Sequence, residues 1–171
     1  MTEKIAKWFI GIFGFLTGTM FGKYLTVFII SLFPILELRG GLIAATILDL
    51  NPWVSFAVCF LGNILPIPFI LWGIKWLFKI MKKNKTLGKF VNWCENKADK
   101  HKGQIEKYGF WGIVLFVGIP LPGTGAWTGC LIAALLNMDK KKATIAALLG
   151  VIMAGIIMMI VSFGILGNII H

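Results

Sequence analysis

A group of helix-breaking residues interrupts one of the most apolar stretches of the chain. Residues 117–129 read VGIPLPGTGAWTG, with GFWGIVLF before them and CLIAALL after the break. Proline and glycine both disfavour a continuous helix. The fold must therefore accommodate a loop inside a long apolar segment.

The composition indicates whether this segment lies in water or in a membrane. Hydrophobic residues make up 58% of the 171 residues, charged residues 14%, and the mean hydropathy is +0.86. A chain of this size cannot bury so many apolar side chains in a water-soluble core, so the sequence indicates an integral membrane protein. Its two histidines and three cysteines lack ligand or disulfide spacing, which argues against a metal site, a cofactor and a disulfide framework. No histidine is placed to serve as an intramembrane base, so we do not expect an enzyme.

Lysine residues are concentrated at three places along the chain. Residues 75–107 contain ten lysines against three acidic residues, and smaller groups occur at Lys4 with Lys7 and at residues 140–142. By the positive-inside rule all three groups face the cytoplasm, which places the N-terminus there. The net charge of +10 then reflects topology and attraction to anionic lipids, and it argues against nucleic-acid binding.

Apolar segments of spanning length occur three times. A helix needs about 20 residues to cross a bilayer. Residues 5–22, 52–80 and 143–168 meet this requirement, and a kink is expected in the second at Pro66 and Pro68. The third span starts in the cytoplasm, so the C-terminus is expected on the extracytoplasmic side.

Two further apolar segments, residues 23–50 and 109–137, are interrupted near their centres at FPILELRGG and IPLPGTG. The first span leaves the cytoplasm and the second returns to it, so residues 23–50 start and finish on the outer side. By the same counting of membrane crossings, residues 109–137 start and finish in the cytoplasm. Limbs of about ten residues reach only the middle of the membrane, so we expect two reentrant hairpins. Such loops persist at membrane depth where protein buries them or where they line a wet cavity.

A short internal repeat links the two hairpins. GGLIAATIL at 40–48 and TGCLIAALL at 128–136 share LIAA after each break, and an LG pair follows at 61–62 and 149–150. The two copies have opposite expected orientations, which is the inverted-repeat plan of many secondary transporters. The sequence thus predicts an all-α integral membrane protein in a single domain, residues 1–171, with an inverted repeat of two reentrant helical hairpins and transmembrane helices.

The lysine-rich segment between the halves, residues 81–108, predicts a cytoplasmic amphipathic helix on the membrane surface. Apolar residues gather on one face of this helix: Leu87, Phe90, Val91, Cys94 and Ala98. In the first span, small residues at four-residue spacing offer a packing face that would also suit a homodimer: Gly14, Gly18 and Gly22.

The two breaks carry the residue types expected of an anion site. In each hairpin the returning helix, 42–50 or 126–137, begins at the break, so its N–H groups and partial positive charge point to the membrane centre. Phosphate binds readily at helix N-termini, and glycine lets the backbone approach a ligand. The candidate substrate-binding residues are Glu37, Arg39, Gly40, Gly41, Pro120, Pro122, Gly123, Thr124, Gly125, Trp127 and Thr128.

Two of these residues have alternative roles. A carboxylate such as Glu37 is costly inside a membrane unless it is paired or hydrated. Glu37 either carries a proton as the substrate moves, or holds the hairpin in shape by pairing with Arg39 or by capping N–H groups. Trp127 either stacks on a ligand or wedges the hairpins together.

Three motifs resemble a known family. SLFPILELRGG, LGNILPIPF and FVGIPLPGTGAWTGCLIAALL are similar to the small multidrug export protein family of bacterial membrane proteins, a branch of the DedA-type superfamily with paired reentrant hairpins. The resemblance covers residues 24–165. It implies transport in the bacterial cytoplasmic membrane. The family name suggests drug export, and DedA-type relatives suggest flipping of phosphorylated membrane lipids such as undecaprenyl phosphate.

Three functions remain open from the sequence. The first is a flippase or carrier for an anionic phosphorylated lipid of the polyprenyl phosphate type, which Arg39 and the helix N-termini favour. The second is a small multidrug exporter that exchanges cationic drugs against protons through Glu37, which requires Arg39 to lie away from Glu37. The third is an ion channel, because facing reentrant loops also form filters.

Overall fold

The computed structural model describes residues 8, 10–12, 14, 17–121 and 124–166, and every regular element among them is helical. This confirms the predicted all-α class. Within the predicted first span, residues 5–22, residues 5–7, 9, 13, 15 and 16 lie outside the described residues; residues 17–19 are not helical, and residues 20–22 belong to α2. The elements are α2 (Met20–Leu32), α3 (Glu37–Ile47), α4 (Pro52–Ile64), α5 (Pro66–Met81), α6 (Lys85–Gly118), α7 (Ala126–Leu135), α8 (Lys140–Met159) and the π-helix η1 (Ile160–Leu166).

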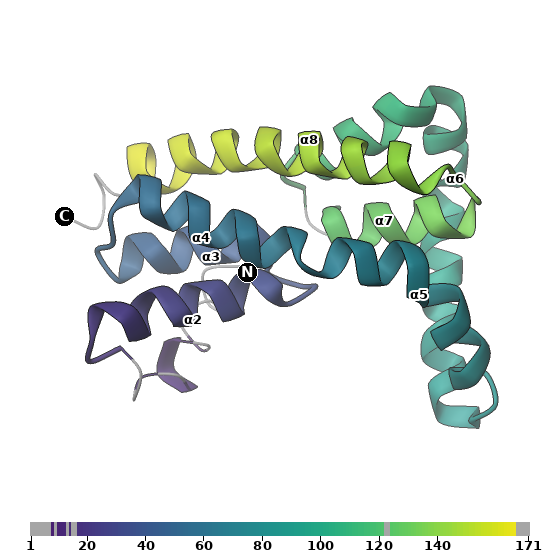
Figure 1. The fold of residues 1–171 in the computed structure, drawn as a ribbon, viewed down its shortest axis with the longest axis horizontal. Helices are drawn as coiled ribbons and strands as arrows, with labels where there is room; N and C mark the ends of the chain where they lie inside the picture. Colours follow the sequence, from purple (N-terminus) through teal and green to yellow (C-terminus); the bar gives the residue numbers. More distant parts are fainter. Residues whose placement is uncertain (1–7, 9, 13, 15–16, 122–123, 167–171) are drawn as a thin grey trace. The chain divides into compact units, whose positions relative to one another are not determined.

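The chain divides into two compact units. The first unit contains residues 1–65 and 151–171, and the second contains residues 66–150. In the first unit α2, α3 and α4 lie side by side, and η1 packs on α3 (Figure 1). In the second unit α7 packs against both α5 and α6. Each unit therefore contains a helical hairpin packed against a further helix.

Two described helices are long and apolar enough to cross a membrane, Pro52–Ile74 and Lys140–Ile165. The first joins α4 to α5 through Leu65, which keeps a helical backbone although Pro66 has no N–H to donate to the preceding turn. Large apolar side chains are exposed along both helices, and Trp53 is 78% exposed. Apolar surface of this extent is stable in contact with lipid, which agrees with a membrane protein.

The helices α2 and α3 form the first hairpin, with the break at residues 33–36. α2 ends where Phe33 adopts an extended backbone, because a residue before proline, here Pro34, is driven away from the helical region. At the open end of the hairpin, Lys23 of α2 donates from Nζ to the Leu48 carbonyl just after α3, at 3.2 Å. The end of α3 therefore lies beside the start of α2.

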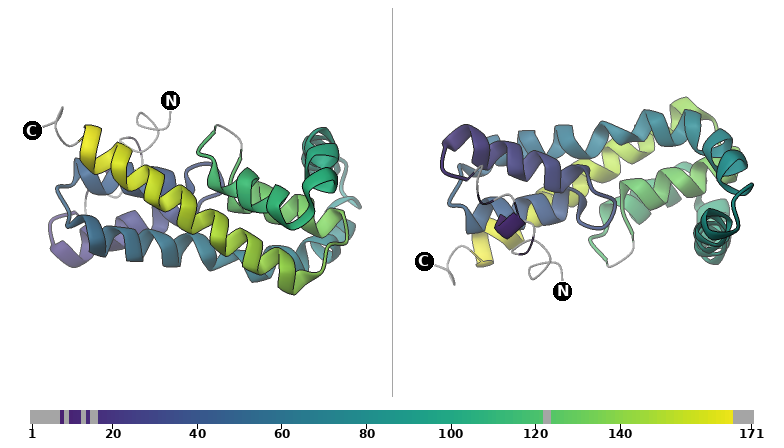
Figure 2. Two further views of the ribbon diagram at one scale, coloured as in Figure 1. Left: turned by 90° about the horizontal axis from the view of Figure 1, so that it is seen from above. Right: turned by 90° about the horizontal axis from the view of Figure 1, so that it is seen from below.

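The C-terminal part of α6 and the helix α7 form the second hairpin (Figure 2). Gly109 separates this part from the rest of α6 with φ 52° and ψ −122°, a conformation that suits glycine because it has no Cβ. The break covers residues 119–125, where Pro120 cannot continue the backbone hydrogen bonding of α6. α7 begins after Gly125, whose φ of 141° also favours glycine.

The returning helices α3 and α7 end in the same local structure. Asp49 and Asn137, 88 positions apart, both have a left-handed backbone, with φ of 53° and 56°. In both cases the next N–H returns to a helix carbonyl at 3.0 Å: Leu50 to Ala45 and Met138 to Ala133. This Schellman arrangement satisfies carbonyls that a helix end leaves without an internal partner.

The helices that follow, α4 and α8, also begin alike. Asn51 and Asp139, again 88 positions apart, accept backbone N–H bonds through their side chains and cap these helices. The shared LIAA at 42–45 and 131–134 is spaced by 89 residues. The sequence match is therefore shifted by one residue from the 88-residue spacing of the structurally equivalent positions. Local structure recurs between the halves, and the opposite orientation of the two copies stays a prediction.

The lysine-rich segment is helical and forms the first part of α6. Its predicted apolar face is partly covered by protein, because Val91 is fully buried against Phe78 of α5 and the last turns of α7. Leu87 on the same face is exposed. The side chains of the other three face residues lie outside the described part: Phe90, Cys94 and Ala98. The predicted contact of this helix with the membrane surface stays a prediction.

Candidate functional site

The first break leads directly into α3. The Leu36 and Glu37 N–H groups both donate to the Phe33 carbonyl, at 3.3 and 2.9 Å, and close a tight turn. α3 begins at Glu37, ahead of the expected start at residue 42. The charged and glycine residues of this stretch therefore lie in the first turns of a helix and not in a loop. Tertiary packing here outweighs the low helix propensity of two consecutive glycines.

Glu37 is buried and has an unusual backbone conformation. Its side chain is 5% exposed, and its φ of 52° lies in the left-handed region. Residues other than glycine are uncommon there, and holding one in such a conformation costs about 1–3 kcal/mol. A buried carboxylate on a strained backbone is typical of functional positions in membrane proteins.

Arg39 also lies in the first turn of α3 and is half-buried. Its positive charge is close enough to interact electrostatically with the charge of Glu37, a question that the sequence leaves open. This attraction offsets part of the cost of burying the carboxylate. An anion that reaches Arg39 would therefore compete with Glu37 for the guanidinium group.

Gly41 lets α3 pack closely against its neighbours, and Gly40 leaves room for the side chain of Leu36 just before α3. A Cβ on Gly41 would overlap the Ser31 Oγ of α2 and would lie 2.8 Å from the Cys59 Sγ of α4. Ser31 and Cys59 also share a side-chain hydrogen bond. A Cβ on Gly40 would lie 2.6 Å from the Leu36 Cβ. Both glycines thus have a packing role, and the ligand contact expected of them stays a prediction.

The same packing position occurs in the second unit. In each unit two glycines, 21 positions apart, face one residue of the first helix of the hairpin. Gly41 and Gly62 face Ser31 of α2, and Gly129 and Gly150 face Val117 of α6. A larger side chain would not fit at either glycine, on the returning helix or on the helix that follows it, because a third helix passes close to both. The glycine pairs are visible in the sequence, whereas nothing there distinguishes Ser31 or Val117.

The second break is held together by its own hydrogen bonds. Thr124 Oγ1 donates to the carbonyls of Ile119 and Leu121, each at 2.9 Å, and the turn includes Pro120. The hydroxyl proton of Thr124 is therefore engaged within the loop, and donating it to an anion would require these bonds to break. The remaining two candidate residues of this loop lie outside the described residues: Pro122 and Gly123.

α7 begins behind this loop without a side-chain cap. Gly125 occupies the N-cap position, and it has no side chain to bond the first N–H groups of the helix. Trp127 and Thr128 lie in the first turn and are half-buried. The start of α7 thus brings partial positive charge to the break, which is the arrangement that binds phosphate in many proteins.

The candidate residues fall into two groups, one at each break. Four belong to the first unit and five described ones to the second: Glu37, Arg39, Gly40 and Gly41, and Pro120, Thr124, Gly125, Trp127 and Thr128. The first group lies within the first turns of α3, whereas the second combines the start of α7 with the loop before it. The opposition of the two groups at the membrane centre stays a prediction.

Three buried side-chain oxygens of the described residues have no hydrogen-bond partner: Ser55 Oγ, Asn63 Oδ1 and Ser162 Oγ. All three belong to the first unit, and Ser162 lies in η1. Buried polar groups without partners are rare, and π-helical turns often occur at functional sites. Asn63 is visible in the sequence as an amide inside a span, whereas single serines in apolar helices give no signal.

Comparison with protein families identifies the chain. The family model described as "Putative small multi-drug export protein" matches residues 37–157, from the first residue of α3 to the last turn of α8. Comparisons with curated proteins and with solved structures gave no match. An export family and two helices of spanning length indicate a membrane transporter. The chain belongs to the small multi-drug export protein family.

Proposed function

We propose that the protein carries an anionic phosphorylated lipid, such as a polyprenyl phosphate, across the bacterial cytoplasmic membrane by way of its two helix breaks. The observation that carries this proposal is the start of α3, where the half-buried Arg39 lies near the buried Glu37. Arginine and helix N–H groups are preferred partners of phosphate. The start of α7, whose N-cap residue Gly125 has no side chain, offers a second helix N-terminus.

The lengths of the hairpin helices support a reentrant arrangement. α2, α3 and α7 contain 13, 11 and 10 residues. At 1.5 Å per residue they extend over about 15–20 Å, roughly half of a hydrocarbon core of about 30 Å. The bond from Lys23 to Leu48 joins the two open ends of the first hairpin, as expected of a segment that enters and leaves on one side.

A contact in the second unit supports the expected topology. Lys140 Nζ lies 5.7 Å from the centroid of the Trp72 ring. Trp72 is near the end of the helix Pro52–Ile74, and Lys140 begins the helix Lys140–Ile165. The first spanning helix therefore ends where the second begins, and the positive-inside rule favours the cytoplasm for this end.

Exchange of partners at Arg39 provides a transport step. Without substrate, Arg39 and Glu37 interact. A lipid phosphate that reaches Arg39 replaces the carboxylate as its partner. Glu37 then takes up a proton, because burial of a carboxylate that has lost a positive neighbour is costly, and it releases the proton when the phosphate leaves. Lipid movement and proton movement are coupled in this scheme.

Export of cationic drugs through Glu37 has less support. A cation would have to approach a carboxylate whose neighbour is the positive charge of Arg39. Like charges in surroundings of low dielectric repel strongly. The half-buried guanidinium of Arg39 is more accessible to a ligand than the buried carboxylate of Glu37, which favours an anionic substrate over a cationic one.

Transport by the purified protein in proteoliposomes tests the proposal. We expect a fluorescent short-chain polyprenyl phosphate to cross faster than in protein-free liposomes. The unphosphorylated polyprenol of equal chain length is the matched control, and its rate should not change because it lacks the anion. Acceleration of a cationic dye without acceleration of the phosphate would contradict the proposal and would favour drug export.

A further inference from the structure

A shallow apolar groove runs along α5 in the second unit. It is lined by Pro68, Phe69, Trp72 and Gly73 and has a volume of about 370 Å³. Phe69 and Trp72 are 71% and 54% exposed. The groove is open at Gly73, because a Cβ there would meet no atom of the described residues within 4 Å. None of the lining residues belongs to either break.

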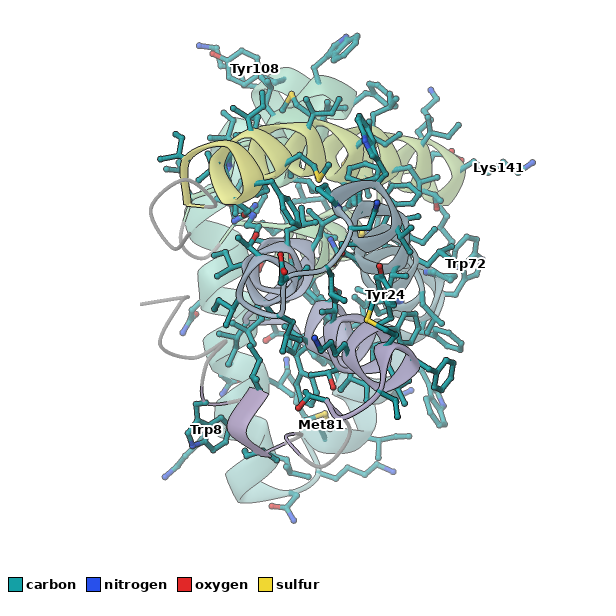
Figure 3. The ribbon with its side chains drawn as sticks, turned by 90° about the vertical axis from the view of Figure 1, so that its left-hand side faces the viewer. Trp8, Tyr24, Trp72, Met81, Tyr108 and Lys141 are labelled. Atoms are coloured by element: carbon teal, nitrogen blue, oxygen red, sulfur yellow. The ribbon has the colours of Figure 1, made fainter. Side chains whose placement is uncertain are left out.

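A lysine cluster at the start of α8 borders this groove. Lys140 Nζ lies over the Trp72 ring at 5.7 Å, within the distance of a cation–π contact. Lys141 and Lys142 continue the cluster and are exposed. Figure 3 shows Trp72 and Lys141 projecting on the same side of the second unit. Helices α5 and α8 thus place positive charge next to an apolar groove.

We infer that this groove binds one acyl chain of an anionic phospholipid, whose headgroup phosphate lies against Lys140, Lys141 and Lys142. Trp72 is near the end of a spanning helix, where tryptophan and lysine side chains meet the membrane–water interface. Lysines at this depth attract anionic headgroups. The lining of the groove is almost wholly apolar, so a water-soluble ligand would find no polar partner in it.

The site is separate from the transport proposal. The bound phospholipid remains at the protein surface, whereas the transported lipid passes the breaks. A headgroup at Lys140 and an acyl chain along α5 would connect the two helices at the cytoplasmic end of the second unit. We therefore expect a phospholipid that stays bound when the protein is extracted from the membrane.

Native mass spectrometry of the purified full chain tests this assignment, with equal amounts of phosphatidylglycerol and phosphatidylcholine. We expect about fivefold more retained phosphatidylglycerol than phosphatidylcholine, the effect of about one lysine at an anionic surface. Lys140→Gln should lower this preference, and Lys140→Gln/Lys141→Gln/Lys142→Gln should abolish it. Lys107→Gln is the matched control, because Lys107 also lies over a ring, that of Tyr108, and it should keep the preference.

A second pair of variants tests the groove itself. Gly73→Leu fills the groove from a position with open space and should reduce retention of both lipids. Gly103→Leu, at another helical glycine with open space around it, should leave retention unchanged. Equal retention of both lipids by the wild type, full retention by Gly73→Leu, or a protein dimer that Gly73→Leu disrupts would each overturn the assignment. The variants leave Glu37 and Arg39 in place, so such a result would not affect the transport proposal.

Discussion

Gly41→Val should destabilise the protein by about 3 kcal/mol, because the new side chain enters a contact that leaves no room for it. A Cβ at this position already overlaps the Ser31 Oγ, and the Cys59 Sγ lies 2.8 Å away. Ser31 is held by a 2.9 Å hydrogen bond to the Val27 carbonyl, so moving it aside carries a further cost. Denaturant-induced unfolding of the purified protein in detergent measures the change.

Two further variants separate this effect from a general effect of substituting glycine. Gly103→Val is the matched control, because a Cβ on Gly103 would meet no described atom within 4 Å, and we expect a change within about 0.5 kcal/mol. Adding Ser31→Ala to the milder Gly41→Ala should restore part of the lost stability, since the overlapped oxygen is gone. Equal stability of Gly41→Val and Gly103→Val would show that α3 does not pack closely on α2 and α4.

Arg39→Gln should lower the free energy of unfolding by about 3 kcal/mol, because it leaves the Glu37 carboxylate buried without its positive neighbour. The same variant should lose transport of polyprenyl phosphate in proteoliposomes, because the phosphate loses its guanidinium partner. Unfolding in detergent and lipid transport are measured on the same preparation.

Removing both charges separates the two effects of this variant. Glu37→Gln/Arg39→Gln should be more stable than Arg39→Gln alone, because no unpaired charge remains, but it should still fail to transport the lipid. Arg39→Lys keeps a positive charge and should retain part of both properties. A double variant no more stable than Arg39→Gln would show that the two charges do not stabilise each other.

Much of the helical layout can be predicted because hydropathy and helix breakers report segment lengths directly. The prolines and glycines of FPILELRGG and IPLPGTG predict two interruptions, and the structure has breaks at 33–36 and 119–125. The start of α7 after Gly125 also agrees with the prediction. The start of α3 does not, because Gly40 and Gly41 indicate a loop in the sequence, whereas both lie within α3 and Gly41 packs against α2 and α4.

The contacts that define the candidate site are beyond what a single sequence reports. Whether Glu37 and Arg39 interact depends on side-chain placement within one helical turn, which sequence spacing leaves open. The role of Ser31 depends on two glycines that are distant in the chain. The LIAA match suggests that equivalent positions in the two halves are 89 residues apart. The helix ends at Asp49 and Asn137 are 88 residues apart, because backbone hydrogen bonds and not apolar identity define equivalent positions.

The most direct test of the central claim is the thermal unfolding midpoint of the purified protein with a polyprenyl phosphate and with the matching polyprenol. A ligand that binds the folded state raises this midpoint. We predict a rise with the phosphate alone for the wild type, and no rise with either compound for Glu37→Gln/Arg39→Gln. An equal rise with both compounds, or an undiminished rise in the double variant, would contradict an anion site at Arg39.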